Sequence, residues 1–356
     1  MATPARSRLG FLLINMAAFV VVVAGMKAAS YILVQVLLAI FLAAITSPAF
    51  FFLQRRGIRP VLALLLLIGL LLLLGLFGFS VVSNSAQSFA DNLPKYQEKI
   101  MGHMDELEIW LNMKGVAMPA GKAKELLATA KLFDYAKTAF GAVSGLFGQG
   151  LIILLITAFF LLEAAMLPKK VAAAVGRTGP SYDHVQEALI NVRRYMGMKT
   201  LVSLFTGFLV WIMALIFRLD YPLLLGVMAF LLNYIPSIGS FMAAIPGVIL
   251  ALVQFGPGRA AWVAVVYTII NVGIGNILEP RIMGRGLGLS PAIILISLVF
   301  WGWVLGPIGM LLSVPLTLSI KIGLQTFDET RGLALLLGAS APKETPAEET
   351  HPQAGG

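Results

Sequence analysis

The chain has 356 residues, of which 59% are hydrophobic and 12% are charged. Soluble domains are about 45–50% hydrophobic and about 25% charged, so this composition excludes an ordinary soluble enzyme and a disordered chain. Lipid must be the solvent for most of the protein. The net charge of +9 is typical of basic cytoplasmic loops in a membrane protein. With no Cys and three dispersed His, the sequence predicts no disulfide, no metal site and no other cofactor.

Residues 1–83 are predicted to form the first three transmembrane segments. The apolar stretches 9–26, 28–53 and 60–83 each approach or exceed the ~20 residues that a helical span needs. The short basic stretch before Pro60 indicates a cytoplasmic turn. Counting two crossings back from that turn places the N-terminus in the cytoplasm as well.

Residues 84–140 are too polar to cross a membrane. Within them, Tyr96, Ile100 and Leu107 recur at helical spacing, which predicts an amphipathic helix that begins near Pro94. A second amphipathic run occupies residues 126–140. We expect an extracytoplasmic helical segment that lies on the membrane or caps the bundle; the alternative is a soluble helical hairpin packed on itself.

Residues 141–330 are predicted to be the transport core. It begins with a fourth span at 143–167 and a fifth at 200–217, separated by a basic loop, 168–199, that should be cytoplasmic. The remaining apolar segments are 222–254, 260–278 and 291–325. Residues 331–356 are expected to be a disordered cytoplasmic tail.

The segments 222–254 and 291–325 resemble each other. Each starts at a proline and is broken by a P-x-I-G or P-I-G sequence, and their first arms cover only about 20 Å of a ~30 Å hydrocarbon core. They are either kinked spans or re-entrant hairpins. Hairpins would place Arg281 inside and Arg259 outside, and would form an inverted pair as in many secondary transporters.

The predicted fold is therefore an all-α integral membrane protein with about eight hydrophobic segments, the sixth and eighth of them broken. Non-helical backbone at membrane depth is tolerated only where it is buried in protein or lines a watery cavity. Both breaks are thus candidate solute or ion sites. Glu279, at the end of a span, is either a proton or cation handle or an interfacial ion pair that anchors its helix. The predicted substrate or ion pathway contains Asn233, Pro236, Ser237, Gly239, Asn271, Asn276, Glu279, Arg281, Gly306, Pro307 and Gly309.

Catalysis and nucleotide binding are not expected. No His pair, Ser-His-Asp set or carboxylate cluster falls within the predicted spans, so the chain is not predicted to be an enzyme. The glycines from Gly284 to Gly288 lack the Lys-Ser/Thr of a phosphate-binding loop and no strand precedes them.

Three motifs carry a family resemblance: NYIPSIGSFMAAIPG, N-x4-N-x3-PRIMG-x3-GLSP and FWGW-x-LGPIGMLLSVPLT. Together they resemble the autoinducer-2 exporter-like (AI-2E) family of bacterial membrane transporters, over about residues 9–330. The resemblance implies an oligomer in the bacterial inner membrane. Some members of that family are described as exporters of autoinducer-2, others as sodium or lithium/proton antiporters.

The sequence thus favours a secondary transporter, an exporter of a small autoinducer-2-like solute, with both termini cytoplasmic. One alternative is a Na⁺(Li⁺)/H⁺ antiporter, and the other is a channel-like or scaffold protein without coupled transport. The expected partners are the lipid bilayer, a small solute or a cation and proton, and further copies of the chain. Neither nucleic acid nor nucleotide is expected to bind.

Overall fold

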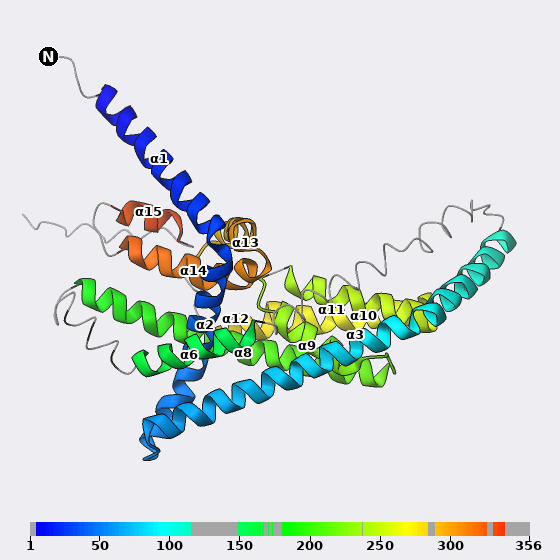
Figure 1. Ribbon diagram of the computed structural model, residues 1–356. Coiled ribbons are helices and arrows are strands. Elements are labelled where there is room, and N and C mark those ends of the chain that lie inside the picture. The colour runs from blue at the N-terminus through cyan, green and yellow to red at the C-terminus, as the bar shows by residue number, and fades with distance from the viewer. Residues whose placement is uncertain are drawn as a thin grey trace, which may run out of the picture.

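The protein is described by a computed structural model that covers residues 5–114, 149–164, 180–236, 238–283, 289–325 and 330–338, with the single residues 166, 170 and 173. Within these ranges every regular element is a helix (Figure 1). Among the described residues, five helices are long and apolar enough to cross a membrane. The prediction of an all-α membrane protein is confirmed.

The first two predicted spans form one bent helix. Helix α1 (Ala5–Ala28) leads directly into α2 (Ser30–Arg55), and Figure 1 shows them as a single blue rod with a bend. Helical hydrogen bonds cross the junction, from Ala29 N–H to Gly25 O at 2.9 Å and from Leu33 N–H to Ala29 O at 3.0 Å. The two predicted spans are therefore not an antiparallel pair. The prediction of a cytoplasmic N-terminus was based on two separate crossings before Pro60, and this part of its basis is removed.

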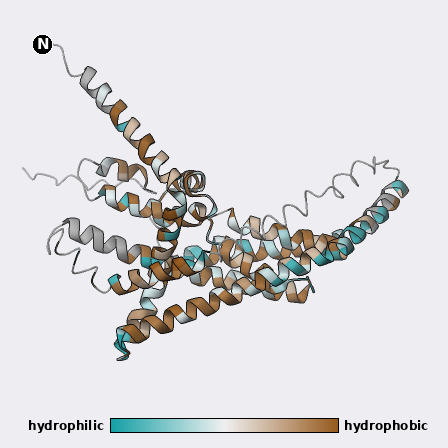
Figure 2. Cartoon of the chain, in the orientation of Figure 1, coloured by the Kyte–Doolittle hydropathy of each residue, from teal (hydrophilic) through white to brown (hydrophobic). Residues whose placement is uncertain are grey.

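Helix α3 (Pro60–Met113) runs through both the third predicted span and the first predicted amphipathic helix. The amphipathic helix was predicted to begin near Pro94. Instead, Pro94 lies in the interior of α3, which continues on both sides of it. Figure 2 shows the apolar start of α3 giving way to a polar far end. The second amphipathic run, 126–140, lies outside the described residues.

Helices α6 (Gly150–Ala164) and α8 (Pro180–Ile216) follow. Helix α6 packs on α2 and α3 through Phe50, Ala63 and Leu161. Helix α8 includes much of the segment predicted as a cytoplasmic loop, 168–199, because no proline interrupts it after its first residue. The fifth span is therefore the C-terminal part of a longer helix.

The first broken segment is a hairpin of α9 (Pro222–Leu232) and α10 (Gly239–Phe255). At its tip, the carbonyl oxygen of Leu232 lies so close to Gly239 that a Cβ there would be 1.8 Å away. At its base, the backbone N–H of Asp220 donates to Gln254 Oε1 at 3.3 Å. The arms are therefore antiparallel, which favours the hairpin interpretation over the kinked span.

The second broken segment is also a hairpin, of α13 (Pro291–Leu305) and α14 (Pro307–Gln325). Gly306 makes the turn with φ 72°. A Cβ on Gly309 would lie 2.0 Å from the carbonyl oxygen of Trp301, and Trp301 Nε1 donates to Thr317 Oγ1 at 3.1 Å. These contacts again require antiparallel arms.

Between the hairpins, α11 (Pro257–Val272), the π-helix η1 (Gly273–Leu278) and α12 (Glu279–Met283) make one continuous span. Near the C-terminus, α15 (Arg331–Leu336) lies in the segment predicted as a disordered tail. That prediction is wrong for these six residues, in which small and apolar residues favour a helical turn.

The turn between α8 and α9 is strained. Arg218 and Tyr221 have φ values of 54° and 57°, in the left-handed region that bulky side chains avoid. Each such residue costs on the order of 1–3 kcal/mol and persists only where its surroundings hold it. Neighbouring contacts must therefore stabilise the base of the first hairpin.

Candidate functional site at the tip of the first hairpin

One face of α8 carries a row of polar side chains towards the first hairpin. Tyr195, Lys199 and Ser203 are spaced four residues apart, so they share a face of the helix. Their residues are only 5%, 4% and 0% exposed. Buried polar groups need partners, and for Lys199 and Ser203 the partners come from the hairpin tip and from α12.

The tip is fastened to this face by two side-chain hydrogen bonds. Asn233, at the C-terminal end of α9, donates from Nδ2 to Ser203 Oγ at 3.0 Å. The next residue, Tyr234, donates from its hydroxyl to Thr200 Oγ1 at 2.8 Å. Thr200 in turn donates to the carbonyl oxygen of Met196 at 2.7 Å. Amide and hydroxyl groups therefore surround the point where the backbone leaves the helix.

The predicted residues around the break fall close together. Gly239 begins α10 and admits no side chain, because the Leu232 carbonyl occupies the place of a Cβ. Asn271 on α11 donates from Nδ2 to the carbonyl oxygen of Ser240 at 3.2 Å, which ties α11 to the first turn of α10. Pro236 lies in the turn itself. Ser237 lies outside the described residues.

An ion pair between a buried lysine and a partly buried glutamate lies beside the tip. Lys199 Nζ is 2.7 Å from Glu279 Oε1, and the two side chains are 5% and 21% exposed. Glu279 was predicted to be either a proton or cation handle or a member of an interfacial ion pair. The structure contains an ion pair, and the partner of Glu279 is Lys199 on α8. Unpaired, either charge would be costly to bury, so each makes the other tolerable.

Lys199 was not among the residues predicted for the pathway. It was assigned to the cytoplasmic loop because it ends a basic stretch, and hydropathy gives no sign that its side chain is buried. A usable signal was the i, i+4, i+8 spacing of Tyr195, Lys199 and Ser203, which continues into the span.

Glu279 directly follows the π-helix η1. A π-turn inserts one extra residue into a helix and shifts the direction of everything after it, and such turns occur frequently at functional sites. Here the shift brings Glu279 to α8. Asn276 on η1 and Arg281 on α12 are exposed, so they do not join the buried pair.

The predicted residues of the second hairpin form a separate group. Gly306, Pro307 and Gly309 lie at the tip of that hairpin, which packs on α1 and α2 through residues that include Trp301 and Val23. The described contacts therefore divide the predicted pathway residues into two groups, one at the tip of each hairpin. The group at the tip of the first hairpin contains more buried polar side chains.

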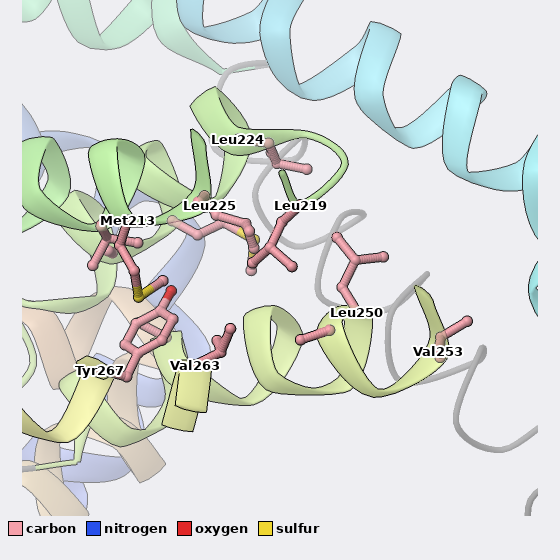
Figure 3. Packing of buried hydrophobic residues seen from close by; sticks show 14 of the residues in the cluster. Met213, Leu219, Leu224, Leu225, Leu250, Val253, Val263 and Tyr267 are labelled. Atoms are coloured by element: carbon pink, nitrogen blue, oxygen red, sulfur yellow. The ribbon is translucent and has the colours of Figure 1, made fainter. Parts of the chain in front are cut away.

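Apolar side chains fill the space between this tip and the base of the hairpin. Figure 3 shows them converging from α8, α9, α10 and α11. They include Met213, Leu225, Leu250, Val263 and Tyr267, all buried. These packed apolar side chains therefore separate the polar tip from the base.

Antiparallel helical hairpins that place polar groups in the middle of an apolar bundle are typical of membrane transporters. Residues 16–329 match the family described as AI-2E family transporter. The chain belongs to this family. The resemblance inferred from the motifs is thereby confirmed.

Relatives match over nearly their full lengths. YhhT of Escherichia coli K12, named as a candidate transport protein, is 35% identical over 346 residues, 96% of this chain and 99% of that protein. The AI-2 transport protein TqsA of the same organism is 34% identical over 326 residues, 92% of this chain and 95% of that protein. A candidate transport protein of Haemophilus influenzae is 34% identical over 332 residues, with coverages of 92% and 95%. These similarities identify a membrane transporter.

Proposed function

We propose that this transporter is a secondary exporter of a small, autoinducer-2-like solute in the bacterial inner membrane. The solute class is suggested by the similarity to TqsA, which is named for AI-2 transport. The observation that carries the proposal is the buried pair of Lys199 and Glu279 beside the hairpin tip. A titratable group there can link proton movement to movement of the hairpin.

The chemistry of the site supports this coupling. Protonation of Glu279 would remove the carboxylate charge and leave the Lys199 ammonium buried without its partner, which is unfavourable. The pair would then separate and release α12 from α8. Beside it, Asn233 donates a hydrogen bond to Ser203, and Tyr234 donates one to Thr200. When the tip moves, the same amide and hydroxyl groups can bind the hydroxyl groups of a solute.

The test uses purified protein in liposomes, with internal pH recorded as autoinducer-2, Na⁺ or Li⁺ is added, with and without a proton gradient. We expect the wild type to exchange autoinducer-2 for protons moving in the opposite direction. Glu279→Gln should reduce the coupled flux at least tenfold while the protein still assembles, because it can no longer gain or lose the proton. The matched control is Glu163→Gln, since Glu163 pairs with Lys170 in an exposed place.

Other outcomes would contradict the proposal. Wild-type coupled flux in Glu279→Gln would remove Glu279 from the coupling. Proton movement that depends on Na⁺ or Li⁺ and not on autoinducer-2 would make the protein a cation/proton antiporter. An uncoupled conductance, or no flux at all, would favour a channel-like or scaffold protein.

The proposal includes the surroundings of the transporter. We propose that the C-terminus is cytoplasmic: the hairpin returns α14 to the side on which α13 begins, and the hairpin arrangement puts Arg281 on the inside. The working form is proposed to be a homo-oligomer in the lipid bilayer, without nucleotide or nucleic acid.

A further inference from the structure

A second polar cluster lies at the opposite end of the first hairpin, where α3 crosses its base. The buried hydroxyl of Tyr96 on α3 donates to Asp220 Oδ2 at 2.7 Å. The same hydroxyl is hydrogen-bonded to the hydroxyl of Tyr221 at 3.2 Å. Asp220 and Tyr221 belong to the turn between α8 and α9, so α3 is attached directly to the start of the hairpin.

Further contacts make this attachment a three-way junction. Asn92 on α3 donates from Nδ2 to the Tyr221 hydroxyl at 3.2 Å. The ring of Phe89 packs against both Tyr96 and Tyr221, with centroids 5.6 and 6.4 Å away. On the far side, the N–H of Asp220 donates to Gln254 of α10. The cluster therefore joins α3 to both ends of the hairpin.

The backbone on both sides of the Tyr96–Asp220 contact is suited to movement. On the turn, Arg218 and Tyr221 are held in the left-handed region, a conformation that persists only while the surroundings impose it. On α3, Pro94 lies two residues before Tyr96 and lacks the N–H that would bond to the preceding turn, so α3 can bend there. Loss of the side-chain contact would let both backbones relax.

We propose that the Tyr96–Asp220 contact is a releasable closure of the transport route at the base of the hairpin. While it is made, α3 covers the base and the apolar side chains behind it, such as Leu224 and Leu250, are shut off from water. The Lys199–Glu279 pair lies at the tip, so the two polar contacts close opposite ends of one route. The purpose of this closure rests on the proposed transport function, although its opening can be measured without transport.

The first test measures access to the closed space. The chain has no Cys, so Leu250→Cys introduces a single thiol at a position only 6% exposed. A charged, membrane-impermeant thiosulfonate should label it slowly. Adding Tyr96→Phe should raise the labelling rate about tenfold or more, because a hydrogen bond to a charged group is lost. Asp220→Asn should act in the same direction.

The controls separate opening of the base from loss of fold. Asp91→Asn changes an exposed carboxylate on the same helix and should leave the labelling rate of Leu250→Cys unchanged. Leu161→Cys, buried in the α2–α3–α6 cluster, should label equally slowly with and without Tyr96→Phe. Equal rates for Leu250→Cys with and without Tyr96→Phe would overturn the proposal. So would faster labelling at both reporter positions, because that means general unfolding.

The second test locks the closure. Tyr96→Cys and Asp220→Cys are joined by a reversible bis-thiosulfonate reagent, in liposomes loaded with autoinducer-2. Efflux should stop on cross-linking and return on reduction, and efflux that continues while the link is intact would overturn the proposal. If the wild type moves no autoinducer-2, the proposed solute is wrong, and the labelling rates still decide whether the closure opens.

Discussion

At the scale of single residues, each hairpin depends on a glycine that faces the opposite arm. Gly309 lies against the backbone of Trp301 and Gly239 against that of Leu232. In both cases the neighbour is a carbonyl group and not the end of a flexible side chain. A methyl group at either position therefore has to push one arm away from the other.

We expect Gly309→Ala to lower the free energy of unfolding by about 1–3 kcal/mol, as overpacked interiors do. The measurement is thermal unfolding of the purified protein in detergent. Gly323→Ala on the same helix is the matched control, because a Cβ there meets nothing within 4 Å. Equal losses of stability in the two variants would show that the arms do not meet as described.

Single residues also show how far sequence reasoning reaches. Asn233 and Gly239 were predicted because polar and small residues beside a proline break are unusual in an apolar segment, and Asn271 because it is polar and lies near the inner part of a span. Lys199 was not, because the local pattern around it is that of a basic loop. Its burial depends on Glu279, which is 80 positions away in the chain, and hydropathy cannot reveal a partner at that distance.

At the scale of elements, the π-helix η1 sets the direction of Glu279. Insertion of one Ala directly after Leu278 should rotate Glu279 and the residues after it by about 100°. Glu279 would then leave Lys199, and proton-coupled flux should fall as far as in Glu279→Gln. The proton-flux assay in liposomes checks this.

The control for that insertion is Gly275→Ala. A Cβ at this position meets nothing within 4 Å, so the substitution keeps the register and should keep the flux. An insertion variant with normal coupled flux would mean that the direction in which η1 presents Glu279 is unimportant.

The elements differ in how far the sequence predicts them. Proline and glycine located both breaks correctly, at Pro236–Gly239 and Gly306–Gly309. Whether a broken segment turns back or continues depends on packing between its arms, which the hydropathy of either arm does not contain. The expectation that a proline marks a helix boundary was wrong at Pro94. Helix α3 is long, and it stays helical although one backbone hydrogen bond is missing at this proline.

At the scale of the whole molecule, the hairpin arrangement fixes which ends share a side of the membrane. Arg218 and Arg259 lie at the base of the first hairpin, and Arg281 lies at the far end of the α11–α12 span. Single-cysteine variants at these three exposed positions can be labelled from outside in intact cells. We expect Arg218→Cys and Arg259→Cys to label alike, and Arg281→Cys to behave oppositely.

A kinked span in place of the hairpin gives another pattern. Arg218→Cys and Arg259→Cys would then label from opposite sides, and Arg281→Cys would label together with Arg218→Cys. That result would contradict the antiparallel arms of α9 and α10. The wild-type chain contains no Cys, so it serves as the negative control for the labelling reagent.

The shortness of α9 has a consequence for biogenesis. Its 11 residues extend only about 16 Å, roughly half of the hydrocarbon core, so the insertion machinery cannot release it into lipid as an independent span. Helix α8 leaves the ribosome immediately before it and offers Gly207, whose backbone carbonyl meets Gly226 of α9. We therefore expect the hairpin to enter the bilayer after α8 and along its surface, with α8 as the intramolecular guide for the part of the protein that carries the candidate site.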